Sequence, residues 1–307
     1  GQKTQPLTFE IPELKISLKL TPDDKGFVQF ECKVKPEYWS PDSPKLYPVS
    51  ITYLGERLKD EIAFRSIETK GSKILLNGKE IFCRGISIHE EAPLRTGRAY
   101  SEDDARTLLS WAKEMNCNFV RLAHYPHNEH MLRLAEKMGL MVWAEIPVYW
   151  SVHYKNQTTY KNAENQLVEM ITRDKNRANI IIWSLANETP RNQERFDFLS
   201  KLANKARSLD SERLISAAME KIEKQPNVLT VEDDLSQILD IISFNQYVGW
   251  YDGMPEKCDK ISWVFTEDKP VFISEFGGCA QAGYHGDVRE RFTEEFQEDL
   301  YQRSINM

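Results

Sequence analysis

The chain has 307 residues, 41% of them hydrophobic, and a formal net charge of −7. This length allows one large domain and a smaller one, each with an apolar core. The negative charge argues against nucleic acid or an anionic membrane surface as a partner. No run of 18 apolar residues occurs, so the sequence predicts no membrane-spanning segment.

Residues 1–69 predict a small β domain. Apolar and polar side chains alternate over residues 14–20, 28–34 and 47–53, and a shorter apolar run covers residues 62–64. Such alternation is typical of strands with one buried face. Four strands of this kind predict part of an immunoglobulin-like β-sandwich, whose complete form has about seven. We therefore expect the sandwich to continue before Gly1.

Residues 70–307 change to alternating strands and helices. The sequence predicts a hairpin with an Asn77-Gly78 turn, and a helix that begins with a capping box of Ser101 and Asp104. Seven further strands are expected near residues 82–88, 119–123, 141–146, 180–185, 214–218, 241–244 and 271–273. Strands that alternate with helices form a parallel sheet. The pattern predicts a TIM (β/α)8 barrel whose eighth strand lies beyond Met307, because seven strands leave two unpaired edges.

Two predicted strands run directly into a carboxylate. Residues 180–185 lead to Glu188 and residues 271–273 lead to Glu275; both strands have the composition of strands buried on both faces. A lone glutamate in this position is usually a helix cap or part of a surface ion pair. Two of them on parallel strands would meet at the C-terminal mouth of a barrel, and glycoside hydrolysis needs two such carboxyl groups.

Four motifs in chain order resemble glycoside hydrolase family 2, the β-galactosidase, β-glucuronidase and β-mannosidase family. They are residues 83–90 (CRGISIHE), 120–126 (VRLAHYP), 182–188 (IWSLANE) and 274–277 (SEFG). The resemblance extends from about residue 43 to the last predicted helix. It implies a retaining exo-β-glycosidase that needs no cofactor. A carbohydrate substrate is the expected partner, and a homo-oligomer is a possible assembly.

The same resemblance implies the catalytic roles. Glu188 corresponds to the acid/base and Glu275 to the nucleophile, and the carboxyl groups of a retaining pair stand about 5 Å apart. Ionising both at this distance is unfavourable, so we expect Glu188 to keep its proton. Asn187 is expected to contact the sugar 2-hydroxyl, as its counterpart does in the family. Arg121 and Tyr247 are the expected hydrogen-bond partners of the nucleophile.

The identity of the sugar is less constrained. Trp250 and Tyr251 offer aromatic faces that suit a sugar ring, although core packing is an equal alternative for either ring. Their segment, residues 245–251, resembles the glucuronidase branch of the family. His89 and Glu91 are further candidates for sugar contact, but Glu91 stands where glucuronidases usually carry aspartate. Their Asn-x-Lys motif would lie beyond the last residue, so galactose, glucuronic acid and mannose all stay candidates.

Three histidines in one segment also suggest a metal site. His124, His127 and His130 are separated by a proline, Pro126, and their spacing does not keep three ligands on one helical face. We therefore expect no metal site: His124 should contact the sugar or its neighbours, and the other two should face solvent. Glu145 also ends a strand, where buried pairing and catalysis are both open.

A rival hypothesis is a catalytically inactive carbohydrate-binding barrel, or an incomplete fragment of an enzyme. The presence of Glu188 and Glu275 argues against a decayed site. The missing eighth strand keeps the fragment hypothesis open.

Overall fold

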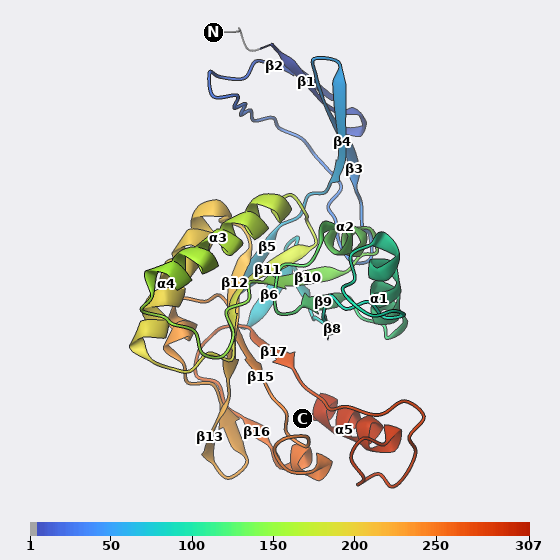
Figure 1. The fold of residues 1–307 in the computed structure, drawn as a ribbon, viewed down its shortest axis with the longest axis vertical. Helices are drawn as coiled ribbons and strands as arrows, with labels where there is room; N and C mark the ends of the chain where they lie inside the picture. Colours follow the sequence, from blue (N-terminus) through green and yellow to red (C-terminus); the bar gives the residue numbers. More distant parts are fainter. Residues whose placement is uncertain (1–4) are drawn as a thin grey trace.

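The computed structural model describes residues 5–307, and its N-terminal part is a single antiparallel sheet. The sheet has the order β2-β1-β3-β4 and projects from one end of the molecule (Figure 1). Its strands are β1 (Leu7–Ile11), β2 (Ile16–Leu20), β3 (Tyr47–Tyr53) and β4 (Glu56–Ile62), with the short helix η1 (Pro12–Leu14) between the first two. Residues 5–307 hold no second sheet facing it, so the immunoglobulin-like sandwich stays a prediction.

The strand predicted at residues 28–34 is wrong. This segment forms no strand, although Phe30 packs against Phe9 of β1 with ring centroids 4.9 Å apart. Alternating side chains indicate an extended chain, but a strand also needs backbone pairing with a neighbour: both edges of β1 are occupied by β2 and β3, and residues 28–34 do not pair with the outer edge of β2 or of β4. The last predicted strand, at residues 62–64, is instead β4, which begins and ends earlier.

Seven parallel strands form the predicted barrel, in the order β17-β15-β12-β11-β10-β9-β8. They are β8 (Gly85–Ile88), β9 (Phe119–Leu122), β10 (Met141–Glu145), β11 (Ile180–Asn187), β12 (Leu214–Glu220), β15 (Ile242–Asn245) and β17 (Val271–Glu275). Neighbours in this order follow one another among the barrel strands of the chain, as crossover connections require. The TIM-barrel class and its seven strands are confirmed, and the eighth strand stays a prediction.

In the described part of the chain, residues 5–307, five α-helices accompany the strands: α1 (Glu102–Glu114), α2 (Glu129–Lys137), α3 (Gln157–Asp174), α4 (Gln193–Leu209) and α5 (Glu294–Asn306). The capping box of Ser101 and Asp104 is present at the start of α1. Gly139 follows α2 at φ +71°, and a Cβ there would come within 2.3 Å of the Pro41 carbonyl oxygen. Only glycine allows this turn. In residues 5–307 no helix is both long and apolar enough to cross a membrane.

Two small sheets complete the structure. One, β5 (Ile67–Lys70), β6 (Lys73–Leu76) and β7 (Lys79–Ile81), contains the predicted hairpin; the other is β13 (Ile222–Gln225), β14 (Val228–Thr230) and β16 (Ser262–Trp263). Short helices η2 (Asp234–Gln237) and η3 (Pro255–Lys260) lie in the later connections. Because β5 pairs with β6, the first small sheet includes residues on both sides of the predicted boundary at residue 69, which stays a prediction.

The first small sheet closes the N-terminal end of the barrel. Ile67, Ile74 and Leu76 share one buried cluster with Phe119 and Trp143 of the barrel strands. Each such side chain stabilises the fold by roughly 1.5–3 kcal/mol through burial. The opposite, C-terminal end of the barrel is where barrel enzymes carry their active sites.

The outward face of β17 departs from prediction. Val271 and Ile273 are 41% and 36% exposed, whereas the sequence predicted burial on both faces. That prediction is wrong because α5, the helix after this strand, packs against η3 instead (Figure 1). β17 and β8 approach each other, but they are the two ends of the hydrogen-bonded order.

A buried carboxylate, Glu136 of α2, joins the barrel to the N-terminal sheet. It accepts hydrogen bonds from the Ala178 backbone N–H at 2.5 Å and from Arg177 at 3.2 Å. Arg177 also binds Asp60 of β4 at 2.8 Å. Burial raises the pKa of Glu136 to about 7, although Arg177 and the Ala178 amide oppose this shift.

We expect Glu136→Gln to become more stable, relative to the wild type, as the pH rises from 5 to 8. The folded state binds the Glu136 proton more tightly than the unfolded chain. The stabilisation that the wild type gains from this proton is therefore complete below about pH 4.5 and is lost as the pH passes about 7. The change should approach about 3 kcal/mol. Thermal unfolding at several pH values measures it, with Glu114→Gln on α1 as control; a pH-independent difference would contradict the assignment.

Candidate active site

Glu188 lies directly after β11 at the C-terminal end of the barrel. Its backbone is left-handed (φ +49°), and its N–H donates to the Ala218 carbonyl of β12 at 2.8 Å. Its two carboxylate oxygens accept hydrogen bonds from the Trp150 indole N–H (3.1 Å) and the Asn245 amide (3.0 Å). Uncommon backbone conformations of this kind cluster at active sites and ligand-binding positions.

Glu275 is the last residue of β17. One of its carboxylate oxygens accepts a hydrogen bond from Arg121 at 2.5 Å, and the other accepts one from the Tyr247 hydroxyl at 2.6 Å. The His124 Nε2 atom lies 3.8 Å from the oxygen bound to Arg121. Burial and the neighbouring Glu275 carboxylate raise the pKa of Tyr247, so its hydroxyl stays a donor. These donors fix the carboxylate and stabilise its charge.

Arg121 of β9 is almost completely buried and connects the polar groups of the site. Besides Glu275, it contacts Glu145 at the end of β10 (3.1 Å) and the Asn187 side-chain oxygen at the end of β11 (2.7 Å). Burial alone would lower the pKa of Arg121, but Glu145 and Glu275 outweigh it and raise the pKa. The guanidinium therefore stays charged and holds three strand ends in one arrangement.

Glu145 is a further partner of Arg121 and helps to hold it in position. It is buried and also contacts His124 Nδ1 (2.7 Å) and the Trp143 indole N–H (2.8 Å). Burial would raise the pKa of Glu145, but Arg121 and His124 hold it below its ordinary value. Of the two alternatives left by the sequence, the structure favours buried pairing, because the groups around this carboxylate are protein side chains.

Two amides lie between the glutamates. The Asn245 amide donates to both the Asn187 side-chain oxygen (3.1 Å) and Glu188, while its own oxygen accepts from Ser274 (2.8 Å). Register shifts between β11 and β12 and between β15 and β17 occur at Asn187 and Asn245. Irregular pairing of this kind redirects side chains at a barrel rim. A continuous set of contacts thus runs from Glu188 to Glu275.

The other predicted sugar contacts are placed differently. Trp250 is 7% exposed and packs against Phe296, as the core-packing alternative expected, whereas Tyr251 is 80% exposed and lies with its ring centroid 5.2 Å from that of Tyr247. His89 is exposed beside His124, with ring centroids 5.4 Å apart.

The remaining histidines of the segment are not arranged as a trio with His124. His127 was expected to face solvent, which is wrong: it is buried, with its Nε2 atom 3.0 Å from the Ala123 carbonyl oxygen. It lies in the connection between β9 and α2. His130 is exposed, as predicted. Among residues 5–307 no group of three or more His, Cys, Asp or Glu side chains is placed to hold a metal ion.

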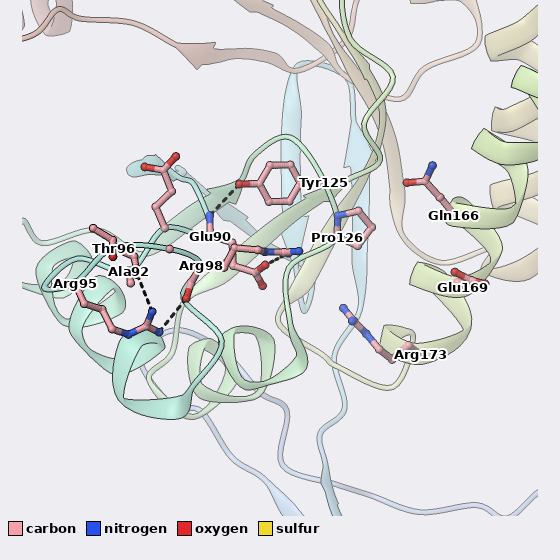
Figure 2. A pocket seen from close by; sticks show the side chains of 12 residues that line it. Glu90, Ala92, Arg95, Thr96, Arg98, Tyr125, Pro126, Gln166, Glu169 and Arg173 are labelled. Atoms are coloured by element: carbon pink, nitrogen blue, oxygen red, sulfur yellow. Dashed lines mark hydrogen bonds and ion pairs between the residues drawn. The ribbon is translucent and has the colours of Figure 1, made fainter.

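A cavity of about 1040 Å³ adjoins the site, between the β8–α1 loop and α3 (Figure 2). Its lining includes Glu91, Arg98 and Arg173, and Tyr125 stands at its wall. The Tyr125 hydroxyl lies 3.4 Å from His89 Nδ1. Glu91 lines this cavity, whereas Glu188 and Glu275 do not.

Three residues around the glutamates were not predicted as part of the site: Trp150, Asn245 and Ser274. Asn245 directly follows the strand predicted at residues 241–244, much as the two glutamates follow theirs, and this position was a usable signal. Trp150 lies in the connection after β10, and nothing in the local sequence distinguishes it from the other aromatic residues near it.

The family model for the TIM barrel domain of glycosyl hydrolases family 2 matches residues 67–306. The match covers all seven barrel strands and both glutamates. The chain belongs to glycoside hydrolase family 2. The resemblance found in the four sequence motifs is confirmed.

Among the similar proteins is a β-glucuronidase of Paenibacillus borealis, which is 29% identical over 96% of this chain and 54% of that protein. A β-galactosidase of an Arthrobacter species is 30% identical over 60% of this chain and 19% of that protein. The crystal structure of a family 2 β-galacturonidase from Eisenbergiella tayi, bound to galacturonate, superposes with a TM-score of 0.83 and 26% identity, over 99% of this chain and 56% of that one. The chain thus spans about half the length of the Paenibacillus borealis β-glucuronidase and of the Eisenbergiella tayi β-galacturonidase.

Proposed function

We propose that this family 2 protein is a retaining exo-β-glycosidase that removes terminal β-linked sugars from oligosaccharides or glycosides by double displacement. The observation that carries the proposal is the pair of differently held glutamates. Glu275 receives hydrogen bonds from a buried arginine and a tyrosine, as a carboxylate nucleophile requires. Within residues 5–307 the donors to the Glu188 carboxylate are neutral, an indole and an amide, as suits a group that must exchange a proton.

In the first step Glu188 donates its proton to the glycosidic oxygen, and the bond from this oxygen to the anomeric carbon breaks. Glu275 attacks the anomeric carbon and forms a glycosyl ester, while the aglycon leaves as an alcohol. As this ester forms, Glu275 loses its negative charge, and the hydrogen bonds that it accepts from Arg121 and Tyr247 weaken. Asn187, which Arg121 holds in place, is the proposed partner of the sugar 2-hydroxyl.

In the second step Glu188, now ionised, accepts a proton from water. The oxygen of that water attacks the anomeric carbon, the ester bond to Glu275 breaks, and the sugar leaves with its original configuration. Both glutamates return to their starting states. His124 and Tyr251 are proposed to border the sugar during both steps, together with His89.

The glycon is proposed to be of the β-glucuronidase or β-galactosidase type. The relatives and structures named above are described as β-glucuronidase, β-galactosidase and β-galacturonidase, which favours a uronic acid.

Nitrophenyl β-glycosides of glucuronic acid, galacturonic acid, galactose and mannose test the proposal, assayed with the full natural protein. We expect turnover of at least one, with a uronide as the best substrate. Binding of a glycoside without turnover would instead support the inactive carbohydrate-binding barrel. The panel also measures which sugar is preferred, because each glycoside differs from the others only in its glycon.

A further inference from the structure

Trp150 is both exposed and bonded to the proposed acid/base. Its side chain is 64% exposed, yet its indole N–H donates to a Glu188 carboxylate oxygen at 3.1 Å. An indole nitrogen can only donate a hydrogen bond, so this contact orients the carboxyl group without competing for its proton. The other oxygen is held by Asn245.

The backbone holds Trp150 in this position. Its N–H donates to the Asn187 carbonyl (3.0 Å), and the Asn187 N–H donates to the Val148 carbonyl (2.9 Å). The Tyr154 hydroxyl donates to the Trp150 carbonyl at 2.9 Å. Trp150 also has a left-handed backbone (φ +54°), which a bulky residue adopts only where its surroundings impose it.

Aromatic rings connect this residue to the other glutamate. Tyr149 lies with its ring centroid 5.5 Å from that of Trp150 and 5.9 Å from that of His124, and His124 approaches Glu275. Tyr149 is 41% exposed. Consecutive contacts of Trp150, Tyr149 and His124 therefore lead from Glu188 to Glu275. The leaving group departs on the side of the acid that protonates it, so Trp150 lies on the aglycon side.

We propose that Trp150 is a dual-purpose residue: its N–H positions Glu188 for proton transfer, and its exposed face binds flat, aromatic aglycons. The proposal rests on the proposed function and adds a substrate class, β-glycosides of phenols. A planar ring can stack on an exposed indole face, while Tyr149 supports that indole edge-on. Alkyl aglycons would gain less from this surface.

Two substitutions separate the two roles. Trp150→Phe keeps a ring but removes the N–H, so we expect kcat/KM for an alkyl glycoside to fall about tenfold, while a dinitrophenyl glycoside, which needs no protonation, changes less than about twofold. Trp150→Ala removes both, and should also raise KM for phenyl glycosides about five- to tenfold. Trp111→Phe, on an exposed part of α1, is the matched control.

Equal losses on the alkyl and dinitrophenyl substrates for Trp150→Phe would overturn the positioning role. The proposed function is tested separately. It stands if the wild type turns over a glycoside and if the activity lost in Glu188→Gln depends on the leaving group of the substrate. Should no glycoside be turned over, the proposed function and the positioning role both fail. Calorimetry with a phenyl thio-β-glycoside of each sugar then tests the aromatic surface: equal affinity of wild type and Trp150→Ala would overturn it.

Discussion

Glu275→Gln should abolish turnover of every glycoside, including those with the best leaving groups. Glutamine cannot form the glycosyl ester, and no other carboxylate among the contacts of Arg121 and Tyr247 can replace it, since Glu145 is buried beneath them. We expect a loss on the order of 10⁵-fold or more, as for other removed nucleophiles. Steady-state kinetics on a dinitrophenyl glycoside measures it, with Glu298→Gln on the exposed face of α5 as control.

Covalent labelling provides a second measurement of the same assignment. A 2-deoxy-2-fluoro glycoside with a good leaving group should trap the ester on Glu275, and mass spectrometry of peptides locates the label. The sugar first released by the active enzyme should keep the β configuration, because a retaining pair stands about 5 Å apart. Labelling of another residue, or inversion of configuration, would overturn the double-displacement mechanism.

Glu188→Gln should divide substrates by their leaving groups. An alkyl glycoside needs a proton on its departing oxygen, so we expect kcat/KM to fall about 10²- to 10⁴-fold. A dinitrophenyl glycoside leaves without this proton and should form the glycosyl ester at a rate within about tenfold of the wild type. The amide can still accept from Trp150 or Asn245, so the local geometry should be preserved.

Pre-steady-state kinetics makes this second prediction sharper. With the dinitrophenyl substrate, the variant should show a burst of product, because hydrolysis of the ester also needs a base at Glu188. Glu220→Gln, at the exposed end of β12, is the control for a neutral substitution near the barrel mouth. Equal losses on both substrates, without a burst, would remove Glu188 from the acid/base role.

Local sequence was sufficient for the barrel strands and for the two glutamates. β11 is eight consecutive buried residues, all apolar except Ser184 and Asn187, and a nearly continuous apolar run of this kind has few alternatives to a strand in a covered parallel sheet. The helix starts were also local, because the capping box of Ser101 and Asp104 involves residues three positions apart. Glu188 could be singled out because a carboxylate after a buried strand is unfavourable without a partner. Glu275 was singled out because it follows a short apolar run, although β17 is only partly buried.

Contacts between distant residues decided the rest. Residues 28–34 alternate like a strand, but they pair with no strand of the sheet β2-β1-β3-β4, and Phe30 only packs its ring against Phe9. Val271 and Ile273 are as apolar as the residues of β11, yet they stay exposed because α5 packs elsewhere. Trp150 reaches Glu188 across 38 positions of sequence. A residue's own sequence neighbourhood sets its preferred backbone and its hydrophobicity, whereas the partner that it meets depends on how the whole chain closes.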